Sequence, residues 1–400
     1  MTQHTDSGVL LIYCCAMRRS LISSFAAVAA TGSLGLFAAS AVADASSAAS
    51  APRPAPASAA TTTQPVPASG STSATVTTAP TTTTPKHKPK PRPTATPAVA
   101  AKLTLSSPDA FVIKKDSAVL AGRFVQITGS VSHYVPGQVV KIKASLNKKV
   151  FHTGKLALKP GKPGTGTGTF TVTVKAKAGG ILRVQATHRA TAQLKGFSRV
   201  IAISSMTTNV QYGSTGLFVD LVQEKLAALH IYIPQTGVWD SGTQWAINAY
   251  HRLLNRGYST ALDATTLNDL LAGKGSFTVR YPKQGRHVEG DLGKQLAALI
   301  DGSKVYWIFP ISSGKPSTPT ILGSFQIYNR VPGYLPDGMY YSDFFIRGYA
   351  LHGYDPSPDY PASHGCMRLP IQDAIPAFNW LGLGDWVDVY QGSGNYSATS

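Results

Sequence analysis

The chain has 400 residues, of which 37 are glycine and 27 are proline, and it carries a net charge of +18. This length exceeds one ordinary domain, and the uneven clustering of Gly and Pro indicates modules joined by linkers. The charge is concentrated, because residues 101–206 hold 17 Lys and Arg against two Asp, whereas residues 281–400 hold 8 against 10 acidic residues. These numbers exclude a single-domain protein and assign the basic character to one module.

Residues 1–45 predict a secretory signal peptide. Two arginines precede a long apolar run, which ends in small residues that place cleavage near Ala43 or Ala45. The natural start could be Met17, and an uncleaved membrane anchor stays open because the apolar run is nearly long enough to span a bilayer. We therefore expect a secreted protein of the cell wall or periplasmic-side space.

Residues 46–100 are nearly all Ala, Thr, Pro and Ser. Such a composition cannot bury a core, so this segment predicts a disordered linker. Residues 101–206 instead show period-two alternation with β-branched residues, which predicts an immunoglobulin-like β-sandwich. Its predicted strands are 123–131, 138–146, 169–176 and 181–188.

The lysines of residues 101–206 fall at polar positions of these strands and loops, which predicts a cationic surface. That surface either keeps the module soluble or binds anionic polymers of the wall. We expect no nucleic acid partner, because an exported module without interleaved aromatic residues is a poor candidate for one.

Residues 207–275 predict a small three-helix domain. Val219, Val222, Leu226 and Leu229 form one apolar helical face, and a second helix follows a turn in which Asp240 or Ser241 can cap it. The stretch resembles the peptidoglycan-binding domain 1 family, which implies binding to cell-wall glycopeptide. His251 departs from the family's usual glutamine. The matching residues are Val219, Val222, Gln223, Leu226, Gly237, Trp239, Asp240, Thr243, Ala246, Ile247 and Tyr250.

Residues 276–391 predict a mostly β domain with a helix at 372–383, and residues 392–400 a disordered tail. The predicted strands are 276–282, 304–312, 322–330, 344–353 and 385–391. The fold class is therefore multidomain and mainly β.

Cys366 lies in the stretch "ALHGYDPSPDYPASHGCMRLP" and is the only cysteine beyond residue 15. An exported chain that has lost Cys14 and Cys15 with its signal cannot form an internal disulfide, so a retained thiol predicts a nucleophile. His352 can act as its base if the Pro-rich segment forms a loop, and Arg368 adds positive charge. A buried structural cysteine, or a zinc site of His352, His364 and Cys366, stays open as an alternative.

The two pieces "HG" and "SHGCMR" of this stretch resemble the YkuD-type L,D-transpeptidase catalytic domain, at His352-Gly353 and at residues 363–368. The segments "GSFQIYNR" and "MYYSDFF" also resemble the family. Tyr354 departs from it, since many members carry a small polar residue there, and so does the displaced Thr318-Pro319 pair.

The resemblance implies that Cys366 is the acylated nucleophile and His352 its base, oriented by the carbonyl of Gly353. It also implies that His364 shapes the site and that the amides of Gly365 and Cys366 form an oxyanion hole. Substrate-binding roles fall to Arg368, Ser363, Tyr340 and Tyr354. We expect no metal and no cofactor, and a monomer.

The resulting expectation is an L,D-transpeptidase of cell-wall biogenesis and cell shape, with peptidoglycan stem peptides and glycan as partners. It would form 3→3 cross-links from a tetrapeptide donor through a cysteine acyl-enzyme. An L,D-carboxypeptidase that hydrolyses the same donor, or a non-catalytic wall-binding protein, remains an alternative.

Overall fold

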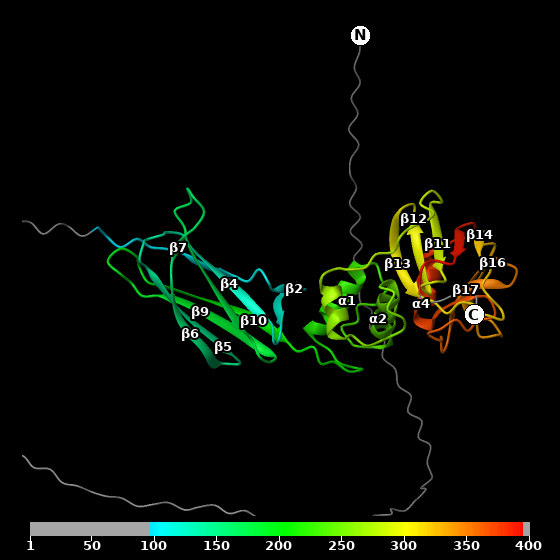
Figure 1. The fold of residues 1–400 in the computed structure, drawn as a ribbon, viewed down its shortest axis with the longest axis horizontal. Coiled ribbons are helices and arrows are strands. Elements are labelled where there is room, and N and C mark those ends of the chain that lie inside the picture. The colour runs from blue at the N-terminus through cyan, green and yellow to red at the C-terminus, as the bar shows by residue number, and fades with distance from the viewer. Residues whose placement is uncertain (1–95, 395–400) are drawn as a thin grey trace, which may run out of the picture. The chain divides into compact units, whose positions relative to one another are not determined.

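The computed structural model describes residues 96–394 (Figure 1). The predicted signal peptide, most of the linker 46–100 and most of the tail 392–400 lie outside these residues. Among the described helices, none is both long enough and apolar enough to cross a membrane.

Residues 103–206 form two β-sheets. The first has the order β1-β4-β8-β7, with β1 Leu103–Ser106, β4 Phe124–Val131, β8 Gly168–Lys175 and β7 Lys159–Pro160. The second has the order β2-β3-β10-β9-β5-β6, with β2 Phe111–Ile113, β3 Asp116–Leu120, β10 Phe197–Met206, β9 Gly180–His188, β5 Val139–Leu146 and β6 Lys149–Ala157.

The four strands predicted in this region are present as β4, β5, β8 and β9. Alternate residues of both sheets, such as Val125 and Ile127 from one and Val140 and Ile142 from the other, enter one hydrophobic cluster. Two sheets that share a core in this way form a β-sandwich. Its immunoglobulin-like subtype stays a prediction.

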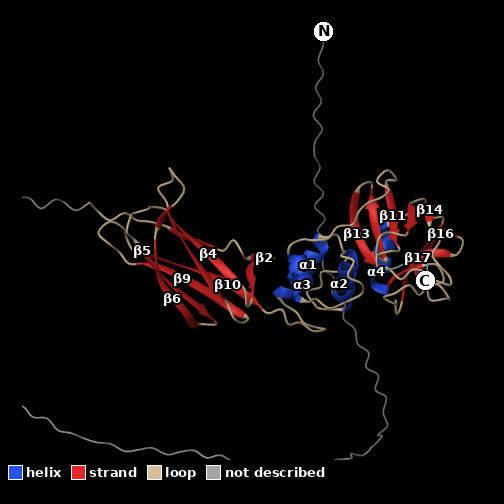
Figure 2. Ribbon diagram, in the orientation of Figure 1, coloured by secondary structure: helices blue, strands red, loops and turns tan. Residues whose placement is uncertain are grey.

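Three helices follow in sequence: α1 Leu217–Ala228, α2 Ser241–Leu253 and α3 Ala264–Leu271 (Figure 2). Asp240 caps α2, because its side chain accepts a hydrogen bond from the Thr243 amide at 2.8 Å. Val219, Val222 and Leu226 of the predicted apolar face are buried. Membership of the peptidoglycan-binding family stays a prediction.

The C-terminal region holds two further sheets and α4 Ile371–Trp380. The five-stranded sheet has the order β13-β12-β11-β19-β14, with β13 Lys304–Pro310, β12 Leu296–Asp301, β11 Arg286–Asp291, β19 Trp386–Tyr390 and β14 Gly323–Gln326. The four-stranded sheet has the order β15-β16-β17-β18, with β15 Asn329–Tyr334, β16 Tyr340–Ile346, β17 Tyr349–Tyr354 and β18 Met367–Pro370.

Strand β12 has apolar contacts on both of its faces. Ala297 and Leu299 join the cluster that both C-terminal sheets share, whereas Ala298 and Ile300 join the cluster that contains the helices α1 to α3. The five-stranded sheet is therefore covered by the second sheet on one side and by helical residues on the other.

Three predicted elements of this region are wrong in detail. Residues 276–282 form no strand, because the amides of Arg280 and Tyr281 donate to the Glu289 side chain instead of to a neighbouring strand. The predicted strand 344–353 is the hairpin of β16 and β17, and 322–330 is divided between β14 and β15.

Candidate active site

Six of the nine sequence-predicted site residues line one cavity of about 400 Å³. Its lining includes Cys366, His352, His364, Ser363, Tyr354 and Arg368, all of which were predicted, together with Asp337, Met339, Gly348 and Tyr349.

Two parallel strands bring the cysteine and the histidine to this cavity. Strands β17 and β18 pair in parallel, with His352 opposite Arg368. Cys366 ends the loop 355–366, which connects the two strands, so it lies one residue before β18. The Pro-rich segment therefore forms a loop between the strand of His352 and the strand that follows Cys366, as the sequence predicted.

His352 is held as a neutral imidazole. Its side chain is 2% exposed, and its Nδ1 lies 2.8 Å from the carbonyl oxygen of Gly353. Because a carbonyl only accepts, Nδ1 carries the proton and Nε2 of the neutral ring is left as the acceptor. Burial lowers the pKa of His352 to about 4, against an opposing effect of the Gly353 hydrogen bond.

Cys366 is held as a neutral thiol. It is partly exposed, and its Sγ lies 3.8 Å from the Gly348 carbonyl oxygen. Burial of the sulfur raises the pKa of the thiol, although the positive charge of Arg368 opposes the rise. The partly exposed position on a cavity wall does not fit the alternative of a fully buried structural cysteine.

The turn before Cys366 is fixed by Ser363 and Gly365. The buried Ser363 hydroxyl donates to the Cys366 carbonyl at 2.6 Å and accepts from the Gly365 amide at 3.0 Å. Gly365 has φ of 124°, and a Cβ there would lie 2.5 Å from the ring of Tyr349. Ser363 therefore holds the turn, and the Gly365 amide expected in the oxyanion hole is already engaged.

Arg368 lies on the cavity wall with its guanidinium carbon 3.9 Å from the centre of the Tyr354 ring. Its Nη1 is 3.5 Å from the Ala362 carbonyl oxygen, and its buried Nε has no hydrogen-bond partner among the described residues. The exposed His364 lies beside Lys315, with 3.4 Å between Nε2 and Nζ. Positive charge therefore borders the cavity.

Three predicted residues, Gly353, Gly365 and Tyr340, are not among the described residues that line the cavity. Gly353 is buried against α4, since a Cβ there would lie 2.7 Å from the Cβ of Ala374. Tyr340 pairs with Gly353 across β16 and β17, and its ring lies 4.3 Å from that of Tyr334.

Sequence reasoning missed four lining residues, Asp337, Met339, Gly348 and Tyr349. Asp337 and Met339 lie in the connection between β15 and β16, Gly348 lies in the turn between β16 and β17, and Tyr349 begins β17, so none comes from the loop that carries the thiol. Only the segment "MYYSDFF" gave a signal for this part of the chain, and it pointed to Tyr340 instead of to the adjacent Met339.

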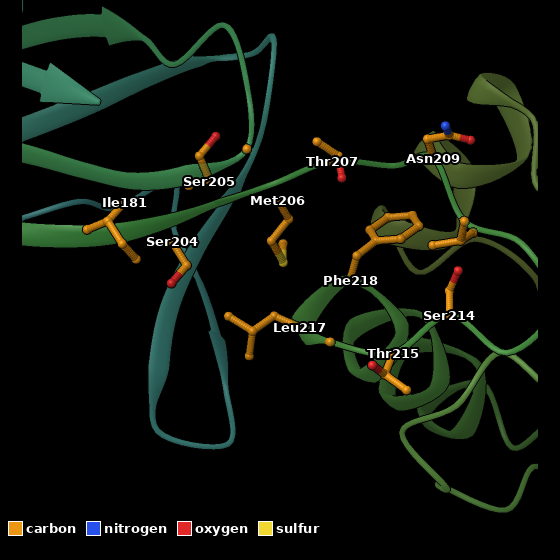
Figure 3. A pocket seen from close by; sticks show the side chains of 14 residues that line it. Ile181, Ser204, Ser205, Met206, Thr207, Asn209, Ser214, Thr215, Leu217 and Phe218 are labelled. Atoms are coloured by element: carbon orange, nitrogen blue, oxygen red, sulfur yellow. The ribbon is translucent and has the colours of Figure 1, made fainter. Parts of the chain in front are cut away.

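The described residues form no metal centre. No group of three or more His, Cys, Asp or Glu side chains there could hold a metal, so the zinc alternative finds no ligand set among residues 96–394. A second cavity of about 450 Å³ is lined by the end of β10, the segment that follows it and the start of α1 (Figure 3). Its lining carries hydroxyl, amide and apolar groups and none that titrates near neutral pH.

Residues 285–389 match the YkuD family, described as the L,D-transpeptidase catalytic domain. The chain is similar to the crystal structure of the L,D-transpeptidase from Xylanimonas cellulosilytica, with 30% identity over 46% of this chain and 98% of that one, and a TM-score of 0.41. It is also similar to an L,D-transpeptidase from Stackebrandtia nassauensis, with 23% identity over 48% and 98% of the two chains and a TM-score of 0.32. No curated protein matches the chain.

Proposed function

Because residues 285–389 belong to the YkuD family of L,D-transpeptidase catalytic domains, we propose that this chain is an exported enzyme that forms 3→3 cross-links in peptidoglycan. One observation carries the proposal. His352 and Cys366 line one cavity, and the hydrogen bond of Nδ1 to Gly353 leaves Nε2 as the proton acceptor.

In the first half-reaction, Cys366 Sγ attacks the carbonyl of the third, diamino-acid residue of a tetrapeptide stem. His352 Nε2 accepts the thiol proton as the carbon–sulfur bond forms. The tetrahedral intermediate then collapses, the proton passes to the departing amine of D-Ala, and a thioester remains on Cys366. The Cys366 amide is the better placed oxyanion donor of the predicted pair, because the Gly365 amide is bonded to Ser363.

In the second half-reaction, the side-chain amine of another stem attacks the thioester. His352 Nε2 accepts a proton from that amine and returns it to the departing sulfur, so the enzyme is regenerated with a 3→3 amide bond formed. We assign Arg368 to the substrate, because its positively charged guanidinium lies on the cavity wall, where it can pair with a carboxylate or carbonyl oxygen.

The test is to incubate the purified protein with a labelled tetrapeptide stem and an amine acceptor stem. We expect a cross-linked dimer and released D-Ala from the natural chain and neither from Cys366→Ala. Release of D-Ala without a dimer would instead assign the chain as an L,D-carboxypeptidase, and full cell function of Cys366→Ala would favour a non-catalytic wall protein. A thioester mass on the Cys366 peptide would identify the acyl-enzyme.

We further propose that the wall itself is the partner of the two modules before the catalytic domain. Helices α1 to α3 would bind glycopeptide, in keeping with the resemblance of residues 219–250 to a peptidoglycan-binding family. Pull-down of the chain with insoluble peptidoglycan, compared with cellulose, tests this role, and equal retention on both polymers would contradict it.

The sandwich would bind an anionic wall polymer through the outer face of β6, β5 and β9. Lys141, Lys143, Lys155 and Arg183 are all exposed on this face, which we call the basic face. Lys141 lies directly opposite Lys155, an arrangement of like charges that destabilises a sheet. Among the described ion pairs, none involves these four side chains. A sheet face with unneutralised positive charge suits a polyanion.

A further inference from the structure

Among the described residues, Arg252 of α2 is the largest side chain that is almost fully buried, at 2% exposure. It leaves the helical module and reaches backbone carbonyls of the catalytic domain. Its Nη1 donates to the carbonyls of Gln295 at 2.7 Å and Ile311 at 2.8 Å. Its Nη2 donates to the carbonyl of Asp359 at 3.2 Å.

The Asp359 contact lies within the loop 355–366, which ends in Cys366. The Arg252 guanidinium therefore connects α2 of the helical module to the catalytic domain. It contacts both the end of β13 and the middle of the active-site loop. The ring of Tyr258 lies 4.4 Å from the guanidinium carbon and covers it. A planar fork with several donors suits such a multiple contact, whereas a lysine ammonium cannot reproduce its geometry.

The contact with Gln295 connects Arg252 to the turn of the nucleophile. The Gln295 side chain accepts from the Ser313 amide at 2.9 Å and donates to its hydroxyl at 2.7 Å. The Ser313 carbonyl accepts from the amides of Ala362 and Ser363. Ser363 in turn bonds Gly365 and Cys366. A continuous set of hydrogen bonds thus runs from α2 to the nucleophile.

A contact of a different kind provides a matched comparison. Lys294 donates from Nζ to the Leu253 carbonyl at the end of α2, at 3.1 Å. It joins the same two parts of the chain next to Arg252, yet none of its hydrogen bonds to described residues involves the loop 355–366. Loss of Lys294 and loss of Arg252 should therefore weaken the same interface and differ in their effect on the loop.

We propose that Arg252 is a positioning residue that makes the helical module part of the active site, by holding the loop 355–366 so that Cys366 faces His352. The module would then do more than bind the wall, because the nucleophile is set in place through it. The arrangement acts through backbone carbonyls, so it fixes the loop whatever the side chain at position 359 is.

The test compares Arg252→Lys with Lys294→Met in the full chain. We expect Arg252→Lys to raise hydrogen exchange of the loop 355–366 about tenfold or more, while Lys294→Met leaves it within about twofold of the natural chain. In the transpeptidation assay, Arg252→Lys should lower kcat about tenfold with little change in KM, because the loop presents the nucleophile after the stem has bound. Arg252→Gln serves the same purpose if the lysine variant does not fold.

Equal loop exchange in Arg252→Lys and the natural chain would overturn the inference, and so would an equal rise in Lys294→Met. The kcat measurement depends on the proposed function, whereas hydrogen exchange does not. A chain without transpeptidase activity but with the expected exchange pattern would therefore refute the proposed function and leave the role of Arg252 standing.

Discussion

At the residue scale, the site is defined by two neutral groups. A thiolate–imidazolium pair would need a thiol pKa below that of the histidine, yet burial moves the pKa of His352 down to about 4 and that of Cys366 up. At neutral pH the proton therefore stays on sulfur, and in the proposed reaction His352 would receive it only as the sulfur attacks. A thiol kept protonated is also less readily oxidised than a thiolate.

This protonation state predicts an alkaline profile for the reactivity of Cys366. Because only the thiolate reacts, the rate of alkylation by iodoacetamide should rise through pH 9 without a plateau near neutrality. Arg368→Gln should shift the profile to still higher pH, because the positive charge of Arg368 lowers the thiol pKa. Mass spectrometry of the Cys366 peptide measures the rate at this site alone. A plateau of high reactivity between pH 5 and 7 would indicate a resident ion pair and contradict the prediction.

Gly365 gives a second prediction at this scale. Its φ of 124° and the 2.5 Å approach to the Tyr349 ring leave no room for a methyl group. Gly365→Ala should therefore lower the free energy of unfolding by more than about 2 kcal/mol or displace the turn that holds Cys366. Gly348→Ala is the control, because a Cβ there meets nothing within 4 Å, and it should change stability by less than about 0.5 kcal/mol. Urea unfolding of both variants measures the difference, and equal stability would show that the ring of Tyr349 moves away at little cost.

At the scale of elements, the sequence predicted those strands whose two faces differ. β4, β5, β8 and β9 alternate between buried and exposed residues, and the period of two is visible in their letters. β12 was missed because "LAALI" is buried on both faces and shows no alternation. Residues 276–282 alternate but have no partner strand, since the side chain of Glu289 takes their amides. Whether such an alternating segment pairs as a strand therefore depends on residues outside the segment.

The difference between local sequence pattern and tertiary pairing also explains which residues of the site could be predicted. Cys366, His352 and Arg368 belong to a motif of chemically unusual residues close together in sequence. Asp337 lies in the connection between β15 and β16, and Tyr349 begins β17, so both reach the cavity of the thiol only after β17 has paired with β16 and β18. Their contribution depends on tertiary structure, and no local pattern marks it.

The two faces of β12 give a prediction for this element. Leu299 faces the core of the catalytic domain and Ile300 faces the cluster of the helices, and both are fully buried. Replacing either by Ala should lower the free energy of unfolding by about 2–5 kcal/mol, because each change leaves a cavity. Asp301→Ala at the exposed end of the strand is the control and should be nearly neutral.

Ile300→Ala and Leu299→Ala should differ in which elements lose protection from hydrogen exchange. Hydrogen exchange should increase in α2 for Ile300→Ala and in β17 and β18 for Leu299→Ala, because each side chain supports a different neighbour of the sheet. The same exchange pattern in both variants would show that the two sides of the sheet unfold as one unit.

At the scale of the whole molecule, the excess positive charge and the candidate active site lie in separate modules. The catalytic domain is close to neutral, whereas the sandwich carries a net charge of +15. A basic module in the same chain raises the local concentration of the catalytic domain at an anionic polymer without altering the cavity around Cys366. The proposed attachment and the proposed reaction can therefore be separated by mutation.

The basic face yields the last prediction. Binding of the chain to a poly(glycerol phosphate) oligomer should weaken about tenfold or more between about 0.05 M and 0.3 M salt, because exposed charges are screened. Changing Lys141, Lys143, Lys155 and Arg183 to Gln should abolish most of this binding while the sandwich stays folded, since all four side chains are exposed. It should even stabilise the sheet slightly by removing the Lys141–Lys155 repulsion.

The matched control removes four positive charges elsewhere in the same module, by changing the exposed Lys102, Lys162, Lys177 and Lys195 to Gln. If net charge alone drives binding, the two quadruple variants should lose affinity equally, and the basic face would then have no special role. If vesicles of anionic lipid bind the chain more tightly than the oligomer at equal phosphate, the partner is a membrane surface instead of a wall polymer. Retained affinity in the control and lost affinity in the basic-face variant is the outcome that we expect, because closely spaced charges on one sheet act together on a chain of phosphates.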